Sequence, residues 1–197
     1  MDYDVASRAV VFALAVDGSV TVTGSSVAAN IGTDTLKSIE ILSGSIFDDT
    51  FAGFVANETL AGANGNDYLD LSAQNADLTI DLSQPAGSAH LGAASMVLTS
   101  IEQVKGGSGS DLFTGVGAHN LFDGNGGNDT VSYALASRAI TADLANGQAR
   151  SAFGLGGIGS DALISIENLV GGTGADSILG SDSANDLRGG ASGDTID

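Results

Sequence analysis

The sequence predicts an all-β fold, a parallel β-solenoid (β-roll) of short strands joined by glycine-rich turns, with wider coils in between. The first observation is composition: 29 of the 197 residues are glycine and one is proline, yet 43 % are apolar, so the chain turns often and can still bury a core. The second is a nine-residue period, in which nine nonapeptides all begin with Gly. The third is an apolar eighth residue in every nonapeptide. This regularity favours a repeat architecture over a disordered glycine-rich chain.

The nonapeptides form three gapless blocks, residues 44–70, 106–132 and 171–197. Glycines allow the backbone to turn through positive φ, and a three-residue strand follows with its middle side chain pointing inward. Two nonapeptides close one coil, and stacked coils share one narrow core. The side chains expected in that core are Phe51, Leu60, Leu69, Phe113, Phe122, Val131, Ile178, Leu187 and Ile196.

Longer segments, 71–105 and 133–170, separate the blocks, and the first 43 residues are a partial equivalent. Alternating apolar residues predict strands over 78–82 and 140–144, with turns at 84–85 and 146–147. The apolar stretch 10–16 is also expected to be a strand, since it is too short to span a membrane. Whether these segments continue the solenoid or bulge from it stays open. Three apolar residues at three-residue spacing end each segment and are expected in the core: Leu36, Ile39, Leu42; Leu98, Ile101, Val104; Leu163, Ile166, Leu169.

A Ser-Ile-Glu motif precedes each block, at residues 38–40, 100–102 and 165–167. These motifs divide the chain into three repeat units, 1–70, 71–132 and 133–197, which we expect to form a single solenoid domain. Both termini fall inside repeat units, so we expect the sequence to be part of a longer chain. The glutamates of the three Ser-Ile-Glu motifs, Glu40, Glu102 and Glu167, are either metal ligands or hydrogen-bond acceptors for backbone amides, and we favour the second role.

The charge balance is strongly acidic, with a formal net charge of -18. Of the 24 acidic residues, 20 are Asp, the carboxylate that suits tight turns and oxygen-ligand metal sites. Such a chain repels nucleic acid and anionic membranes, and its compact form repels itself unless a cation binds. The absence of Cys excludes disulfides and thiol-ligated metals.

An oxygen-bearing side chain occupies the sixth position of every nonapeptide. The first and third nonapeptides of each block always carry Asp there, whereas the middle ones carry Glu58, Asn120 and Asn185. Plain turn chemistry, in which Asp or Asn bonds its own backbone amides, would use the two residues interchangeably. The asymmetry favours metal binding, and the middle turns are expected to be empty.

The turns at 106–111, 124–129 and 171–176 come closest to the pattern GGxGxDxUx, and the chain therefore resembles the RTX (repeats-in-toxin, hemolysin-type) calcium-binding repeat family. The resemblance implies calcium held between turns of consecutive coils by backbone carbonyls and by the sixth-position Asp. Turns one and three of a block then share a side, which implies three sites. Phe47 and Ser192 depart from the glycine pattern in the first and last blocks. The implied metal residues are Asp49, Asp67, Gly107, Gly109, Asp111, Gly124, Gly126, Asp129, Gly172, Gly174, Asp176, Gly189, Ala191 and Asp194.

Catalysis is not expected. The two histidines, His90 and His119, lie in different segments, and only six Lys and Arg are available to neutralise an acidic sugar substrate. The resemblance implies a secreted module, exported by a type I secretion system, that folds when it meets extracellular calcium. We expect a structural or extender segment of a secreted or cell-surface protein such as an adhesin or surface-layer protein, with polysaccharide or neighbouring domains as partners. The alternative is the calcium-responsive C-terminal tail of a secreted hydrolase or polysaccharide-modifying enzyme.

Overall fold

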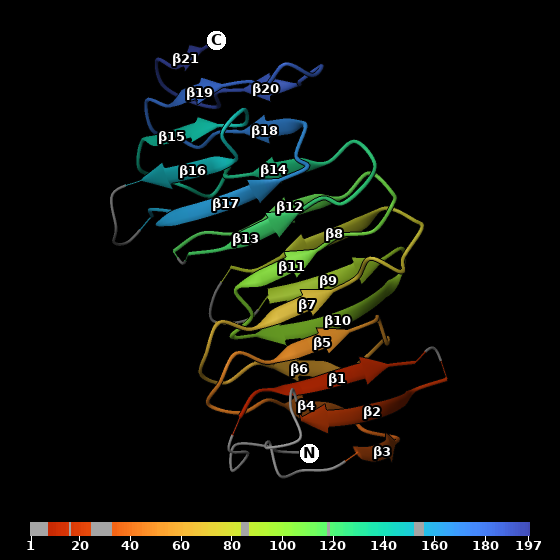
Figure 1. Ribbon diagram of the computed structural model, residues 1–197. Helices are drawn as coiled ribbons and strands as arrows, with labels where there is room; N and C mark the ends of the chain where they lie inside the picture. Colours follow the sequence, from red (N-terminus) through yellow and green to blue (C-terminus); the bar gives the residue numbers. More distant parts are fainter. Residues whose placement is uncertain (1–7, 16, 25–32, 84–86, 118, 152–155) are drawn as a thin grey trace.

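The computed structural model describes residues 8–15, 17–24, 33–83, 87–117, 119–151 and 156–197. The described residues form 21 short strands and no helix, so none of them belongs to a helix that could span a membrane. The strands lie one above another along a single direction, from the N-terminal unit at the bottom of Figure 1 to the C-terminal unit at the top. They make two sheets, of nine and of twelve strands.

The nine-stranded sheet contains, in spatial order, β20 (Leu187–Arg188), β18 (Asn168–Val170), β14 (Thr130–Ser132), β12 (Leu112–Thr114), β8 (Leu78–Asp81), β9 (Gly87–Leu91), β10 (Ala94–Thr99), β6 (Thr59–Ala61) and β4 (Ile41–Ser43). The twelve-stranded sheet contains β21 (Thr195–Ile196), β19 (Ser177–Leu179), β15 (Ile140–Asp143), β16 (Gln148–Ser151), β17 (Ser160–Ile164), β13 (Leu121–Asp123), β11 (Gln103–Lys105), β7 (Tyr68–Asp70), β5 (Thr50–Ala52), β1 (Val10–Leu14), β2 (Ser19–Gly24) and β3 (Thr33–Lys37).

The nine-residue period sets the strand register as predicted. Consecutive nonapeptides alternate between the two sheets, so the first and third strands of a block pair in parallel, with partners 18 residues apart. The partners are Phe51 with Leu69, Phe113 with Val131, and Ile178 with Ile196. Two nonapeptides therefore make one coil, and the two-sheet solenoid is confirmed.

The eighth residues form the core between the sheets. Seven of the nine are at most 1 % exposed, while Leu187 is partly buried and Ile196 is 46 % exposed at the last strand of the stack. The Phe12 and Phe51 rings stack with centroids 4.6 Å apart, and Phe113 meets Phe122 from the opposite sheet at 5.6 Å. The expected core residues of the wide segments are also buried, except that Leu36 and Ile39 are only partly so.

The wide segments continue the solenoid, and each does so by an antiparallel meander in one sheet. In the second unit β8, β9 and β10 run antiparallel to one another in the nine-stranded sheet, while the twelve-stranded sheet passes directly from β7 to β11. The third unit reverses the arrangement, with β15, β16 and β17 in the twelve-stranded sheet and β14 paired directly with β18. The first unit places β1, β2 and β3 in the twelve-stranded sheet.

The strands expected in these segments are confirmed as β1, β8 and β15, although Val16 lies outside the described residues. The turn at Asn146-Gly147 is present, with Gly147 at φ 65°. The turn expected at Gln84-Pro85 lies outside the described residues.

The first and third turns of each block stack with adjoining segments into three columns, through backbone hydrogen bonds between successive coils. Column I contains residues 44–49, 62–67 and 100–102; column II contains 71–77, 106–111, 124–129 and 165–167; column III contains 133–139, 171–176 and 189–194. Columns I and III lead into strands of the twelve-stranded sheet, and column II leads into strands of the nine-stranded sheet. Turns entering one sheet lie at the opposite edge of the solenoid from turns entering the other, so column II faces away from columns I and III.

Glycine permits this stacking where the next turn touches its Cα. A Cβ on Gly109 would lie 2.6 Å from the Ala76 carbonyl carbon and the Asp77 nitrogen, both backbone atoms of the turn below. On Gly126, in the turn above, a Cβ would meet nothing within 4 Å. The two positions therefore form a matched pair for testing the turn stack.

We expect Gly109→Ala to lower the free energy of unfolding by about 2 kcal/mol, because backbone atoms cannot move aside cheaply. Gly126→Ala should change it by less than about 0.5 kcal/mol. Urea unfolding in calcium-containing buffer, followed by circular dichroism, measures both. Equal effects of the two substitutions would contradict the stacking of columns.

Candidate metal centres in the turn columns

The first turn of a block is closed by its own sixth residue. In the second block the Gly107 N–H donates to Asp111 Oδ2 (2.8 Å), and in the third the Gly172 N–H donates to Asp176 Oδ2 (2.7 Å). These bonds hold one oxygen of each carboxylate inside its turn, where Asp111 and Asp176 are each 2 % exposed.

The first block closes in the same way despite its departure at Phe47. The Ser45 N–H donates to Asp49 Oδ2, and the Ser45 hydroxyl donates to Asp49 Oδ1 (3.0 Å). Phe47 itself is exposed, and its carbonyl packs against Gly65 of the next coil. The second-position N–H therefore closes this turn as in the other two blocks, although Phe47 occupies the fourth position.

The other carboxylate oxygen reaches across to the neighbouring coil. The Asp111 N–H donates to Asp129 Oδ1 (2.7 Å), and the Leu78 N–H donates in turn to Asp111 Oδ1 (2.8 Å). We call this series the carboxylate ladder. Its other contacts are Asp49 N–H to Asp67 Oδ1 (2.7 Å), Asp176 N–H to Asp194 Oδ1 (2.9 Å), Ile140 N–H to Asp176 Oδ1 (2.9 Å) and Val10 N–H to Asp49 Oδ1.

The structure therefore brings together all three aspartate pairs that the sequence paired, each across one coil. The Ser-Ile-Glu motif extends two of the columns, because the Asp67 N–H donates to Glu102 Oε2 (2.9 Å) and the Asp129 N–H to Glu167 Oε2 (2.8 Å). The predicted role of these glutamates as acceptors for backbone amides is confirmed for both. Glu40 has no such bond among the described residues; the pKa of Glu58 is raised by burial and, to a smaller extent, by the charge of Glu40.

Burial makes the ladder electrostatically costly. Burial is the main cause that raises the pKa of Asp67 to about 7, and the nearby carboxylates of Asp49 and Glu102 contribute to that shift. The pKa of Asp129 is likewise raised to about 7 by burial, with Asp111 and Glu167 adding to the shift. Their Oδ2 atoms are fully buried and have no hydrogen-bond partner. A divalent cation would satisfy these oxygens and neutralise the charge.

Backbone carbonyls face the carboxylates at the same places. A Cβ on Gly44 would lie against Asp49 Oδ2 and 2.6 Å from the Gly62 carbonyl oxygen of the next coil. Gly106 separates Asp111 Oδ2 from the Gly124 carbonyl in the same manner, and Gly171 separates Asp176 Oδ2 from the Gly189 carbonyl. Carboxylate and carbonyl oxygens are the ligands that calcium prefers, so the donor set fits that ion.

The remaining glycine-turn residues predicted as ligands lie in the stack between these carboxylates. The Gly107 carbonyl accepts the Gly126 N–H (3.2 Å), and the Gly172 carbonyl accepts the Ala191 N–H (3.0 Å). A carbonyl oxygen has two lone pairs, so the Gly172 carbonyl keeps one for a cation, whereas the Gly107 carbonyl also accepts the Asn125 side-chain amide (2.8 Å) and has both engaged. Gly109 and Gly174 pack against backbone atoms of the turns below. Among the described residues no three carboxylate or imidazole side chains gather around one point.

The middle turns carry different contacts. The side-chain amide of Asn185 accepts the Ser181 N–H (2.7 Å) and donates to the Glu167 carbonyl (2.7 Å), so plain turn chemistry accounts for it. Asn120 donates its own N–H to Asp161 Oδ1 (2.9 Å), while its side-chain amide is buried without a partner.

Asp161, which the sequence did not single out, is a buried carboxylate outside the nonapeptide blocks. Its Oδ2 accepts the Tyr133 hydroxyl (2.9 Å), and burial raises the pKa of Asp161 to about 7. Both of its oxygens are engaged, and it serves as a structural anchor for the middle turn of the second block. No repeated motif marks this position, so only the fold identifies it.

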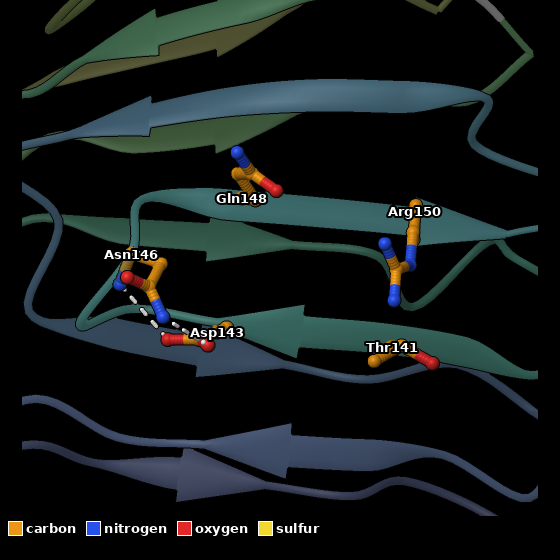
Figure 2. A pocket seen from close by; sticks show the side chains of 5 residues that line it. All are labelled: Thr141, Asp143, Asn146, Gln148 and Arg150. Carbon is orange, nitrogen blue, oxygen red and sulfur yellow. Dashed lines mark hydrogen bonds between the residues drawn. The ribbon is translucent and has the colours of Figure 1, made fainter.

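A shallow hollow of about 340 Å³ lies on the outer face of the β15–β16 hairpin, lined by Thr141, Asp143, Asn146, Gln148 and Arg150. Figure 2 shows the Asn146 side chain turned toward Asp143, whose carboxylate accepts both the N–H and the side-chain amide of Asn146 (2.9 and 2.7 Å). These bonds lower the pKa of Asp143, which is unsuited to general acid catalysis. The hollow presents hydrogen-bonding groups to a polar ligand, without a paired acid and base.

Fold and site together define a calcium-binding β-solenoid. The model of the RTX calcium-binding nonapeptide repeat matches residues 38–69, 100–133 and 164–196, which make up half of the chain, and the protein belongs to that family. The matched ranges begin at or next to the Ser-Ile-Glu motifs and end at or next to the third strand of each block. No curated protein matches the chain. The repeats bind Ca²⁺, and no catalytic domain is detected in this sequence.

The raised pKa values predict how stability depends on pH when calcium is removed. The folded carboxylates of Asp67, Asp129 and Asp161 have pKa values of about 7, whereas unfolded Asp titrates near ~3.9. Between these values the folded state binds more protons, so the free energy of unfolding should fall as pH rises from about 4 to about 7 and then level off. Thermal unfolding in calcium-depleted buffer at several pH values, with sucrose added to keep the calcium-free chain folded, measures the slope.

The Asp67→Asn, Asp129→Asn double variant should lose part of this slope, and Asp161→Asn should remove a further part. The exposed Asp182→Asn variant serves as the control and should keep the full slope. A calcium-depleted protein that gains stability from pH 5 to pH 7 would show that these carboxylates are not destabilising.

Proposed function

We propose that this chain is a calcium-dependent structural segment of a secreted or cell-surface protein, which folds when it meets extracellular calcium. RTX repeats are typical of secreted proteins, and the roughly straight stack of coils in Figure 1 suits an extender that separates or presents other parts of a protein. An adhesin or surface-layer protein is the kind of protein that we propose for it. Calcium binds at the three aspartate pairs of the first and third turns.

The observation that carries the proposal is the pair of buried, unpartnered oxygens on Asp67 and Asp129. Each belongs to a carboxylate that is 0 % exposed and lies between two further carboxylates along its column. Removing a carboxylate from water without a partner is unfavourable by several kcal/mol. The folded state is therefore strained in the absence of a cation and relieved by one.

The size of the calcium effect on stability follows from the coupling between calcium binding and folding. For a site with Kd of ~0.1 mM, tenfold excess calcium stabilises the folded state by about 1.4 kcal/mol. Three such sites contribute roughly 4 kcal/mol, a large part of the ordinary stability of a domain. The net charge of -18 adds repulsion that calcium also reduces. This is sufficient for calcium to decide whether the chain is folded.

The alternative, the calcium-responsive tail of a secreted hydrolase, would use the same sites. The roughly straight stack of coils in Figure 1 is the observation that favours the extender.

A calcium titration followed by far-UV circular dichroism tests the proposal. We expect the parent chain to gain β signal on addition of calcium and to lose it with chelator. In the Asp111→Asn, Asp129→Asn double variant, the amide oxygens can still accept the backbone N–H groups, but two charges are removed. Its stabilisation by tenfold excess calcium should be smaller than that of the parent by at least about 1.4 kcal/mol, the share of one site.

The matched control is the Asp182→Asn, Asp197→Asn double variant, which removes the same charge from exposed positions. It should keep the calcium response of the parent. A parent chain with the same β spectrum and the same unfolding temperature in calcium and in chelator would reject calcium-coupled folding.

A further inference from the structure

The Ser-Ile-Glu motif forms a turn of its own in columns I and II, between the third turn of one block and the middle turn of the next. Ser100 and Ser165 both adopt a left-handed conformation with φ 50°, and Ser38 in the first motif has φ 54°. The Glu102 N–H donates to the Asp67 carbonyl and the Glu167 N–H to the Asp129 carbonyl (both 3.2 Å). The motif therefore occupies the place that a further nonapeptide turn would take.

The third nonapeptide turn beneath it is not closed in the way that the first turn is. In the first turn of each block the second-position N–H donates to the Oδ2 atom of the sixth residue. In the third turn the second-position residues, Ala63 and Asn125, have φ 80° and 66°, and neither N–H bonds to that oxygen. The Oδ2 atoms of Asp67 and Asp129 are left buried without a partner as a result.

A serine carbonyl converges on each of these oxygens. A Cβ on Gly62 would meet both Asp67 Oδ2 and the Ser100 carbonyl oxygen, and a Cβ on Gly124 would meet both Asp129 Oδ2 and the Ser165 carbonyl oxygen. Within the described part of the chain, no N–H donates to either serine carbonyl. Two oxygens that lack partners thus face the same side of a glycine Cα.

The glutamate adds a second charge at the same level. One oxygen of Glu102, Oε2, accepts the Asp67 N–H, which fixes the carboxylate beside Asp67 and leaves Oε1 for another partner. Glu167 stands in the same relation to Asp129. The two ion pairs of the described residues, Lys105 with Asp123 and Arg188 with Asp186, involve other carboxylates.

The same pair of atoms occurs one coil lower at the aspartate sites, where Asp49 Oδ2 faces the Gly62 carbonyl and Asp111 Oδ2 faces the Gly124 carbonyl. We propose that Asp67, the Ser100 carbonyl and Glu102 form a further calcium site, and that Asp129, the Ser165 carbonyl and Glu167 form another. The inference rests on the proposed function in that both sites belong to the same calcium-dependent columns. Calcium fits because all donors are hard oxygens and their number is flexible.

Calcium stoichiometry of the full chain, from equilibrium dialysis and calorimetry, tests the inference. In the Glu102→Gln, Glu167→Gln double variant, the glutamine oxygen still accepts the Asp67 or Asp129 N–H, so a purely structural glutamate would be replaced without effect. The two sites predict two fewer bound calcium ions per chain, or two ions bound at least tenfold more weakly. Each single variant should show half of this effect.

Asp161→Asn is the matched control, since Asp161 is also buried and accepts a backbone N–H but has a second protein partner on Oδ2. It should leave the stoichiometry unchanged. A parent that binds calcium, with stoichiometry and affinities identical in the glutamine variants, would overturn the two glutamate sites alone; a parent that binds none would overturn the proposed function as well.

Crystals of the parent grown in calcium give an independent readout that does not depend on the variants folding. Anomalous density between Asp67 Oδ2 and the Ser100 carbonyl would support the site. A well-ordered map with no ion there would overturn it.

Discussion

The contact on which the rest of the structure depends is an aspartate carboxylate, buried in its own turn, that accepts a backbone N–H from the coil next to it. It fixes the turn and the stacking of coils at once, since one oxygen serves each purpose in Asp111 and Asp176. The same contact places like charges one coil apart in a poorly solvated column. The same carboxylate contact thus causes both the stacking of coils and the repulsion between charges. A bound cation would remove the repulsion and leave the stacking in place.

The sequence predicted the period, the register and the core because all three depend on side-chain identity at fixed spacing. Glycine at position one, an oxygen at position six and an apolar residue at position eight determine the strand pairing of Phe113 with Val131 and the burial of both. The pairing of Asp111 with Asp129 follows from that register. The turns and the core positions depend on residues near one another in the sequence. The strand pairing and the aspartate pairing follow because the same pattern repeats 18 residues later, in the next coil.

The wide segments could not be predicted to the same degree. Alternating apolar residues in 78–82 and 140–144 indicate a strand with one buried face, but alternation is the same for parallel and antiparallel neighbours. The sequence therefore did not reveal the antiparallel meanders or the sheet that each one joins. Asp161 was missed for a related reason: its burial depends on Tyr133, 28 residues away, and no motif links the two.

Each meander adds strands to one sheet while the chain crosses the other in a single step, and successive meanders join opposite sheets. Column II consequently stands on the other edge of the solenoid from columns I and III. If ions bound along one edge only and shortened it, the solenoid would bend toward that edge. With the columns on alternate edges, the bending moments of successive units would oppose one another, and ion binding would leave the axis of the rod close to straight.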